Sequence, residues 1–203
     1  MAIGQGRETN LERSQGRRAQ RRAVLIATNG KSTERKYFDA VKALPWVHAA
    51  RVAVVFTNGA PTELVRDTAR RRDLNDFDEA WAVCDVDEYL ISEPSATARR
   101  LKVKLAWSNP SFEVWLILHH DNCTSHLENG TKACQRLEKY VGKWNKSTLN
   151  FSQFEQGISD AVTRAKELEP SPDNNPSSGI WRLMEALGHT QETAGRRTRR
   201  RTA

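Results

Sequence analysis

The sequence predicts an α/β protein in which a mostly parallel β-sheet is flanked by helices and followed by a C-terminal helical subdomain. In the first half, short apolar runs alternate with segments of helical periodicity. Three of these runs are continuously apolar, which is typical of parallel strands covered on both faces. From about residue 109 onward only helical patterns follow. Repeated strand–helix units imply parallel strands joined by right-handed crossovers.

Four strands are predicted, at residues 23–27, 52–56, 80–84 and 102–107. The fourth alternates polar and apolar residues, as an edge or half-exposed strand does. A helix is predicted from Ser32 to Leu44, stopped by Pro45. Another begins at Pro61, where the missing N–H of proline costs nothing. Its inward-facing residues are Leu64, Val65, Thr68 and Ala69.

The second half predicts four helices. The first opens at Asn109-Pro110 and is apolar nearly all round, so we expect it to be buried. Two amphipathic helices follow at residues 128–141 and 151–168. The segment 174–176 is expected to cap a last helix whose apolar face consists of Ile180, Trp181, Leu183, Met184 and Leu187. Gly188 ends this helix, as a glycine past the last turn commonly does.

The positive charge of the chain lies mainly at its two ends. The formal net charge is +7 over 203 residues, yet residues 1–22 and the tail from Gly195 carry more than this between them, which leaves the body slightly negative. We therefore expect one domain at 23–190 between a basic arm at 1–22 and a basic tail at 191–203. Such arms either bind phosphate backbones or act as solubilising disordered segments. The candidate nucleic-acid contacts there are Arg21, Arg22, Arg199 and Arg200.

Composition argues against a membrane or a secreted protein. No run of 18 or more apolar residues occurs, so no membrane span is expected. The N-terminal segment lacks the apolar stretch of a secretory signal. The three cysteines are an odd number at irregular spacing, unlike a disulfide scaffold. We expect a cytoplasmic protein with reduced thiols.

Two carboxylates follow the third predicted strand, at Asp85 and Asp87. Open α/β sheets build their sites at the carboxyl ends of strands. Oxygen ligands of this kind suit Mg²⁺ or Mn²⁺. The alternative is a strand-end turn, because Asp also initiates turns.

The loop after the first predicted strand contains Gly30-Lys31-Ser32, which resembles the end of a phosphate-binding P-loop. That motif needs a glycine at position 25, where this chain has Leu25, so no such loop is expected. Lys31 and Arg35 remain candidate phosphate contacts near a helix N-terminus. The alternative is a simple helix cap by Ser32 or Thr33 with exposed charges beyond it.

A zinc site is not expected from the second half. His119, His120, Cys123, His126 and Cys134 do not have the spacing of a compact zinc motif. His119 is expected either to end the buried helix or to line the cleft as a basic group.

Four segments together resemble the RloB-like family: Gly30–Phe38, Asp85–Glu88, Ser108–His119 and Asn175–Ser178. The resemblance covers about residues 23–188, and its third segment is the most specific. It implies a divergent Toprim-type fold and Mg²⁺-dependent cleavage or nicking of nucleic acid in phage defence. It also implies an ATPase partner of the ABC or AAA kind.

The chain departs from that family's pattern at one position. The resemblance implies a catalytic glutamate directly after the first strand, where this chain has Asn29, and Lys31 replaces the next acid. An amide can ligate a metal but cannot shuttle protons near neutral pH. Glu34 and Glu113 are candidate substitutes. Either the enzyme is reorganised around Asp85 and Asp87, or the chain is a degenerate module that binds nucleic acid or nucleotide with an ATPase partner.

Overall fold

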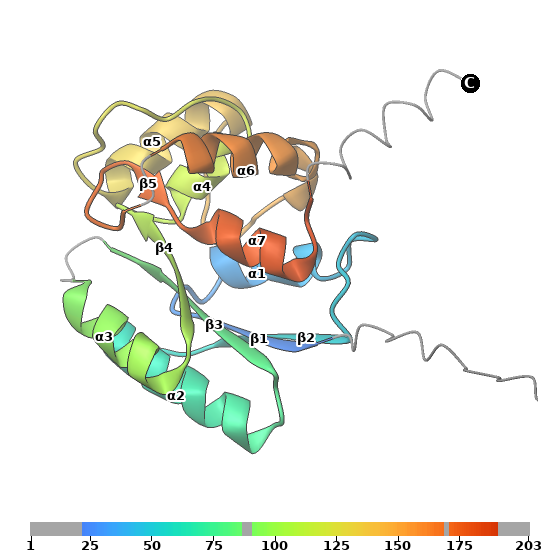
Figure 1. Cartoon of the computed structure of the whole chain (residues 1–203). Helices are drawn as coiled ribbons and strands as arrows, with labels where there is room; N and C mark the ends of the chain where they lie inside the picture. Colours follow the sequence, from blue (N-terminus) through green and yellow to red (C-terminus); the bar gives the residue numbers. More distant parts are fainter. Residues whose placement is uncertain (1–21, 87–90, 169–170, 191–203) are drawn as a thin grey trace, which may run out of the picture.

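The computed structural model describes residues 22–86, 91–168 and 171–190, and it confirms the predicted α/β class. A five-stranded sheet has the order β2-β1-β3-β4-β5 (Figure 1). Strands β1 to β4 are mutually parallel, and β5 pairs antiparallel with β4. The strands are β1 (Ala23–Thr28), β2 (Arg51–Phe56), β3 (Glu79–Asp85), β4 (Lys104–Asn109) and β5 (Ser177–Ser178).

Helices cover both faces of the sheet. One face carries α2 (Pro61–Leu74) and α3 (Ser92–Leu101), and the other carries α1 (Thr33–Val41) and α7 (Ile180–Leu187) (Figure 1). The remaining helices stack beyond α1 and α7 and, together with α7, form the predicted C-terminal helical part. They are α4 (Glu113–Leu118), α5 (Gly130–Val141), the 3₁₀ turns η1 (Phe151–Gln153) and η2 (Glu155–Gly157), and α6 (Ile158–Glu167).

Side chains that point alternately to the two faces of the sheet contribute to two separate hydrophobic cores. Trp81 and Val83 of β3 face the larger core, whereas Ala82 and Cys84 face the smaller core under α2 and α3. This follows from the two-residue side-chain period of a strand. The continuous apolar runs of β1 and β3 therefore reflect burial on both faces, as predicted, whereas β2 is an edge strand and is only partly buried.

The larger core is built around aromatic side chains on α1 and around α4. Tyr37 makes edge contacts with Phe38, Phe112 and Trp115, at centroid distances of 5.3, 5.5 and 6.4 Å. Every residue of α4 is buried, which confirms the predicted buried helix. This packing fixes the first turn of α4, and with it Glu113, against the sheet.

Three local expectations were wrong. β4 continues to Asn109 and α4 begins at Glu113, so Asn109-Pro110 does not open the helix. The amide of Asn175 does not cap α7 but pairs with the backbone of Leu127, donating at 2.7 Å and accepting at 2.9 Å. Only part of the segment 151–168 is α-helix, because η1 and η2 precede α6.

Two elements were not predicted. The α3 segment is rich in Ser, Thr and Ala and has Pro94 near its start, so its apolar periodicity is weak. β5 has two residues and exists through its pairing with β4. Neither element has a local sequence signal of its own.

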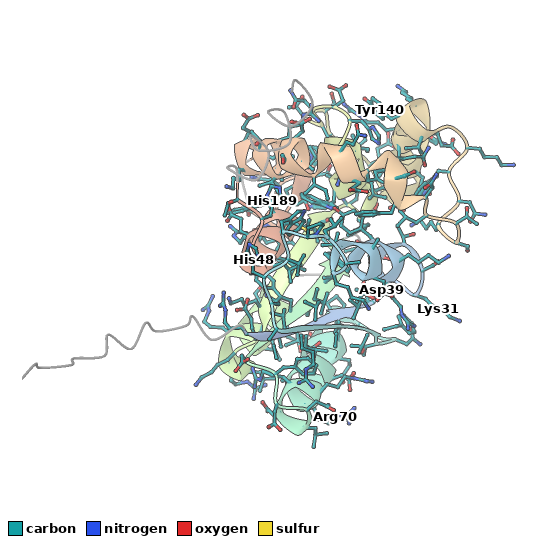
Figure 2. The ribbon with its side chains drawn as sticks, turned by 90° about the vertical axis from the view of Figure 1, so that its right-hand side faces the viewer. Lys31, Asp39, His48, Arg70, Tyr140 and His189 are labelled. Atoms are coloured by element: carbon teal, nitrogen blue, oxygen red, sulfur yellow. The ribbon has the colours of Figure 1, made fainter. Side chains whose placement is uncertain are left out.

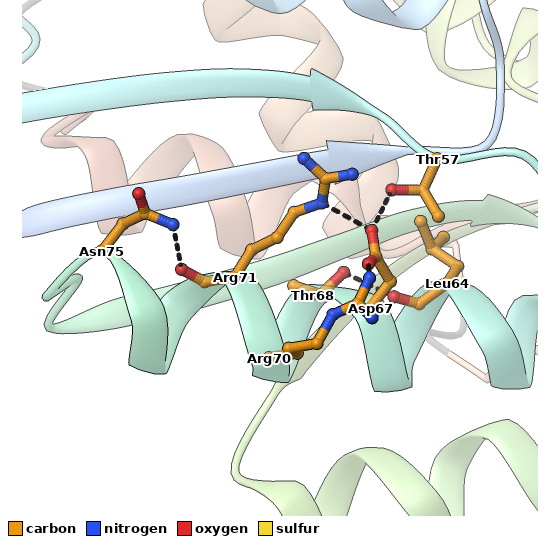
Figure 3. A network of polar contacts seen from close by, with 7 residues as sticks. All are labelled: Thr57, Leu64, Asp67, Thr68, Arg70, Arg71 and Asn75. Atoms are coloured by element: carbon orange, nitrogen blue, oxygen red, sulfur yellow. Dashed lines mark hydrogen bonds and ion pairs between the residues drawn. The ribbon is translucent and has the colours of Figure 1, made fainter.

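An ion-pair network on α2 ties this helix to the loop after β2. Asp67 accepts hydrogen bonds from Thr57 Oγ1 at 2.8 Å and Arg71 Nε at 2.6 Å, and it pairs with Arg70 (Figure 3). Burial raises the pKa of Asp67, but the bonds from Arg71, Thr57 and Arg70 outweigh it, so the net pKa lies below its ordinary value. The network therefore stabilises the charged form of Asp67.

None of the helices in the described residues combines the length and hydropathy needed to span a bilayer. Four predicted site residues fall outside those residues: Arg21, Asp87, Arg199 and Arg200. The predicted roles of the two basic arms likewise stay predictions.

Candidate functional site

The carboxyl ends of β1, β3 and β4 meet at one edge of the sheet and carry three acidic residues. Asp85 is the last residue of β3 and is in register with Ser108 of β4. Glu34 lies in the first turn of α1, just after β1, and Glu113 begins α4, just after β4. The parallel topology thus brings together residues that are far apart in the sequence.

Electrostatics show that these carboxylates lie close enough to interact. Burial raises the pKa of Asp85 well above its ordinary value, and the negative charges of Glu34 and Glu113 raise it further. The pKa of Glu34 is raised as well, first by burial and then by Glu113, against a backbone hydrogen bond that lowers it. We call Glu34, Asp85 and Glu113 the acidic cluster.

Glu113 is held firmly in place by three side chains. Ser111 Oγ donates to its Oε2 at 2.7 Å, and Trp144 Nε1 donates to its Oε1 at 3.3 Å. The Lys146 ammonium group lies 3.2 Å from the same Oε1. The Glu113 side chain is only 2% exposed, so these contacts replace the water that a carboxylate would otherwise bind.

Glu34 lies across the loop that follows β1. A Cβ atom placed on Gly30 would fall 1.7 Å from one oxygen and 2.0 Å from the other oxygen of the Glu34 carboxylate. Only a residue without a side chain therefore leaves room for Glu34 in this position. The glycine of the Gly30-Lys31-Ser32 segment makes space for an acid and builds no phosphate-binding loop.

The carboxylates of the acidic cluster are oxygen donors of the kind that a hard divalent cation binds. The described residues alone, however, do not supply a complete set of metal ligands. Carboxylate oxygens suit Mg²⁺ and Mn²⁺, and burial raises the pKa of Asp85 and of Glu34 because it disfavours their charged forms. Within the described ranges, however, no three His, Cys, Asp or Glu side chains are close enough to hold a metal ion. Asp87, the second predicted ligand, lies outside those ranges.

The other predicted site residues are spread around this edge. Asn29 is partly buried at the end of β1, where its backbone N–H donates to Val83 at 3.3 Å. Lys31 is exposed on the rim (Figure 2) and makes no ion pair within the described part of the chain. Arg35 is exposed, and its Nε lies 3.7 Å from an Asp39 carboxylate oxygen.

Arg22 lies at the other edge of the sheet. It precedes β1, and its guanidinium lies 2.7 Å from the carboxylate of Glu79, the first residue of β3. Because both strands begin there, Arg22 is about the length of a strand away from the acidic cluster. Arg22 therefore lies at the amino ends of β1 and β3, whereas the acidic cluster lies at the carboxyl ends of the strands.

His119 ends α4 and is not a basic group. Its ring is buried between aromatic side chains, with Nδ1 2.8 Å from the Trp115 carbonyl oxygen and Nε2 3.0 Å from the Tyr37 hydroxyl. Burial lowers the pKa of His119 to about 3, so the ring is neutral at physiological pH. The geometry therefore selects the helix-ending alternative for His119.

Sequence reasoning missed Lys146, Trp144 and Ser111. Lys146 and Trp144 lie in the loop 142–150, more than 30 residues beyond Glu113, and this loop has no recognisable motif. Ser111 belongs to the segment 108–119, but its bond to Glu113 depends on the bend between β4 and α4. The only local signal was the Lys-rich composition of the loop around Trp144.

Comparison with known proteins gives one match. The family model described as RloB-like protein matches residues 24–187, which includes every described element from β1 to α7. No curated protein and no solved structure matches the chain.

Proposed function

The chain belongs to the RloB-like protein family, and from this membership and the acidic cluster we propose that it is a metal-dependent nuclease. It would cleave phosphodiester bonds in nucleic acid by Toprim-type chemistry and act in phage defence. The observation that supports this proposal is the meeting of Glu34, Asp85 and Glu113 at the carboxyl ends of three neighbouring parallel strands.

In this proposal the acidic residues have separate tasks. Asp85 and Asp87 hold Mg²⁺ or Mn²⁺, which when bound neutralises charge on the scissile phosphate and activates a water. Glu34 takes over the proton-transfer task that Asn29 cannot perform, because its raised pKa favours proton exchange nearer neutral pH. Glu113 adds negative charge that keeps a cation at this edge.

Basic residues contact the nucleic-acid backbone in the same proposal. Lys31 is exposed just before α1 and free to meet a phosphate (Figure 2), and Arg35 is an exposed residue in the first turn of this helix. The arms, including Arg21, Arg22, Arg199 and Arg200, add affinity that depends on salt and not on base sequence. The protein would work in the cytoplasm with an ABC- or AAA-type ATPase.

The nuclease proposal is tested by incubating the purified full chain with DNA and RNA oligonucleotides. We expect cleavage in Mg²⁺ or Mn²⁺, none after addition of EDTA, and a rate about 10²-fold lower for Glu34→Gln, as for loss of one acid–base group. The matched control is Glu63→Gln, an exposed acid on α2 across the sheet, which should cleave normally. Absence of metal-dependent cleavage on every substrate, with and without an ATPase partner, would count against the proposal.

A second candidate function is a non-catalytic module that binds nucleic acid or nucleotide beside an ATPase. The observation that favours it is the pairing of Glu113 with Lys146, which already neutralises part of the cluster, together with Asn29 at the end of β1. A site of this kind binds without performing metal-assisted hydrolysis.

The variant Asn29→Glu separates the two functions. On a degenerate scaffold the added carboxylate should increase Mn²⁺ affinity, by about tenfold for one extra charged ligand, with no loss of any existing activity. In a reorganised active site it should lower the cleavage rate, because it adds negative charge directly after β1, at the same end of the sheet as Glu34 and Asp85. Isothermal titration with Mn²⁺ and the cleavage assay on the same preparation distinguish these outcomes. Gln156→Glu, at an exposed residue of η2, controls for the added charge.

A further inference from the structure

We propose that the outer face of α5 and the loop that precedes it form a groove that binds the phosphate backbone of nucleic acid. The groove lies on the C-terminal helical part and is separate from the contacts predicted from the sequence. In naming nucleic acid as the ligand, the inference rests on the proposed function. It adds the surface that holds the strand, away from the proposed site of cleavage.

The groove has a volume of about 390 Å³ and lies beside α5 and the loop 122–129. Lys132, Arg136 and Lys139 line it from one face of the helix, because residues three and four positions apart share a face. The loop contributes His126, Leu127 and Glu128. Among these lining residues, three positively charged side chains therefore outnumber one carboxylate.

The walls of the groove are fixed before a ligand arrives. The backbone of Leu127 donates to the Asn175 side-chain amide at 2.9 Å and accepts from it at 2.7 Å, and the Leu127 side chain is buried. Arg136 Nη2 donates to the Asn122 carbonyl oxygen at 2.9 Å, which ties the loop to the helix. A pre-formed site binds its ligand without the cost of ordering a loop.

The two lysines of the groove have no partner of opposite charge. Lys132 and Lys139 are exposed, and across the described ranges neither side chain forms an ion pair or a hydrogen bond. On α2 the situation is the reverse, because each of its four arginines pairs with a carboxylate of the same helix: Arg66, Arg70, Arg71 and Arg72. The positive charge of α2 is therefore balanced within that helix, whereas the lysine charges of α5 are left for a ligand.

The groove suits a phosphate backbone by its charge and by its length. Lys132 and Lys139 are two helical turns apart, about 10 Å along the axis. One strand of duplex DNA carries a phosphate every ~3.4 Å along its axis, so this length spans about three phosphates. The three cations of α5 match that number, and ammonium and guanidinium groups are the usual donors to phosphate oxygens.

The opposite side of the same helix reaches toward the acidic cluster. A Cβ atom on Gly130, the first residue of α5, would fall 3.3 Å from the Ser111 side chain, which donates to Glu113. The groove and the cluster are therefore separated by about the 10 Å diameter of a helix. A backbone held along α5 thus passes near the edge of the sheet where cleavage is proposed.

The test measures binding of the full chain to labelled duplex DNA by fluorescence anisotropy, in EDTA so that no strand is cut. Lys132→Gln combined with Lys139→Gln should raise the dissociation constant about tenfold at moderate salt, because two phosphate contacts are lost. The slope of log K against log salt should become shallower by about 2, since each contact releases about one counter-ion.

The matched control is Arg99→Gln combined with Arg100→Gln, at two exposed arginines of α3 on the other side of the sheet (Figure 1). This pair of substitutions removes the same charge and should change the affinity by less than about twofold. Circular dichroism of each protein confirms that it is folded.

The outcomes separate the groove from the proposed nuclease. Equal weakening by both pairs of substitutions would show attraction to net charge alone and would overturn the groove, as would an unmodified chain that binds no duplex. If a poly-glutamate peptide displaced the label as effectively as unlabelled DNA, the site would fit an acidic protein and the inference would fall. Selective weakening without metal-dependent cleavage of any substrate would support the groove and contradict the proposed nuclease.

Discussion

Gly157→Ala should lower the free energy of unfolding by about 3 kcal/mol, the upper part of the range for overpacked sites. Gly157 is the last residue of η2 and directly precedes α6; its φ of −87° is ordinary, so backbone strain is not the cause. A Cβ atom there would fall 2.2 Å from the His119 carbonyl oxygen and 2.9 Å from its carbonyl carbon. Both are backbone atoms, which cannot rotate away as the end of a side chain can.

The backbone around His119 has little freedom to move. The ring of His119 is bonded to Tyr37 and Trp115, and Arg164 Nη1 donates to the neighbouring Leu118 carbonyl oxygen at 2.7 Å. Gly157 directly precedes α6, and the His119 carbonyl group lies at the end of α4. The added methyl group must therefore push these two helices apart. The loss of packing then extends into the larger core.

Urea unfolding followed by circular dichroism measures the effect of Gly157→Ala. The matched control is Gly130→Ala, at the first residue of α5, where the added Cβ would meet only the Ser111 side chain, at 3.3 Å. This control should change stability by less than about 0.5 kcal/mol. A Gly157→Ala protein as stable as the control would show that α4 and α6 separate easily.

Asp85→Asn should stabilise the fold while it removes metal-dependent activity. Burial and the neighbouring carboxylates raise the pKa of Asp85 above its value in the unfolded chain. Ionisation of Asp85 therefore lowers the free energy of unfolding. This loss is absent below about pH 4, grows as the pH rises, and is complete above the pKa of Asp85 in the folded state. Asparagine does not ionise, so at pH 8 the variant should be more stable, by about 1 kcal/mol.

The same substitution removes a charged ligand from the proposed metal site. Cleavage should fall about 10³-fold, because electrostatic stabilisation of the transition state is often the largest single catalytic contribution. A gain in stability excludes misfolding as the reason for lost activity. Unchanged cleavage by Asp85→Asn would contradict the assignment of the site.

Asp67→Asn is the control of opposite sign for the stability measurement. The pKa of Asp67 lies below its ordinary value, so its ionised form stabilises the fold at neutral pH and this contribution is lost as the pH falls. Asp67→Asn should therefore lower the free energy of unfolding at pH 8. In acid, its stability should approach that of the unmodified chain. Thermal or urea unfolding of the two variants at several pH values checks both signs. If Asp85→Asn lowered the stability at pH 8, burial and the charges of Glu34 and Glu113 would not disfavour ionised Asp85 as described.

The sequence by itself determined the class of fold and most of its elements. Continuous apolar runs predicted β1, β2 and β3. β1 and β3 need apolar residues throughout because they are buried on both faces, whereas β2 is a partly buried edge strand. Helical periodicity predicted α1, α2 and α5, and an apolar stretch predicted the buried α4. Asp85 was identified because it follows a buried strand, and Glu34 and Glu113 because Asn29 stands where the family resemblance implies a glutamate.

Only the tertiary structure decided how these acids are compensated. Lys146 and Trp144 reach Glu113 from a loop that carries no motif, and Gly30 serves to make room for Glu34. The short strand β5 likewise exists only through its partner β4. The physical reason is that local patterns encode burial and periodicity, whereas contacts between distant segments arise when the topology brings strand ends and loops to one edge of the sheet.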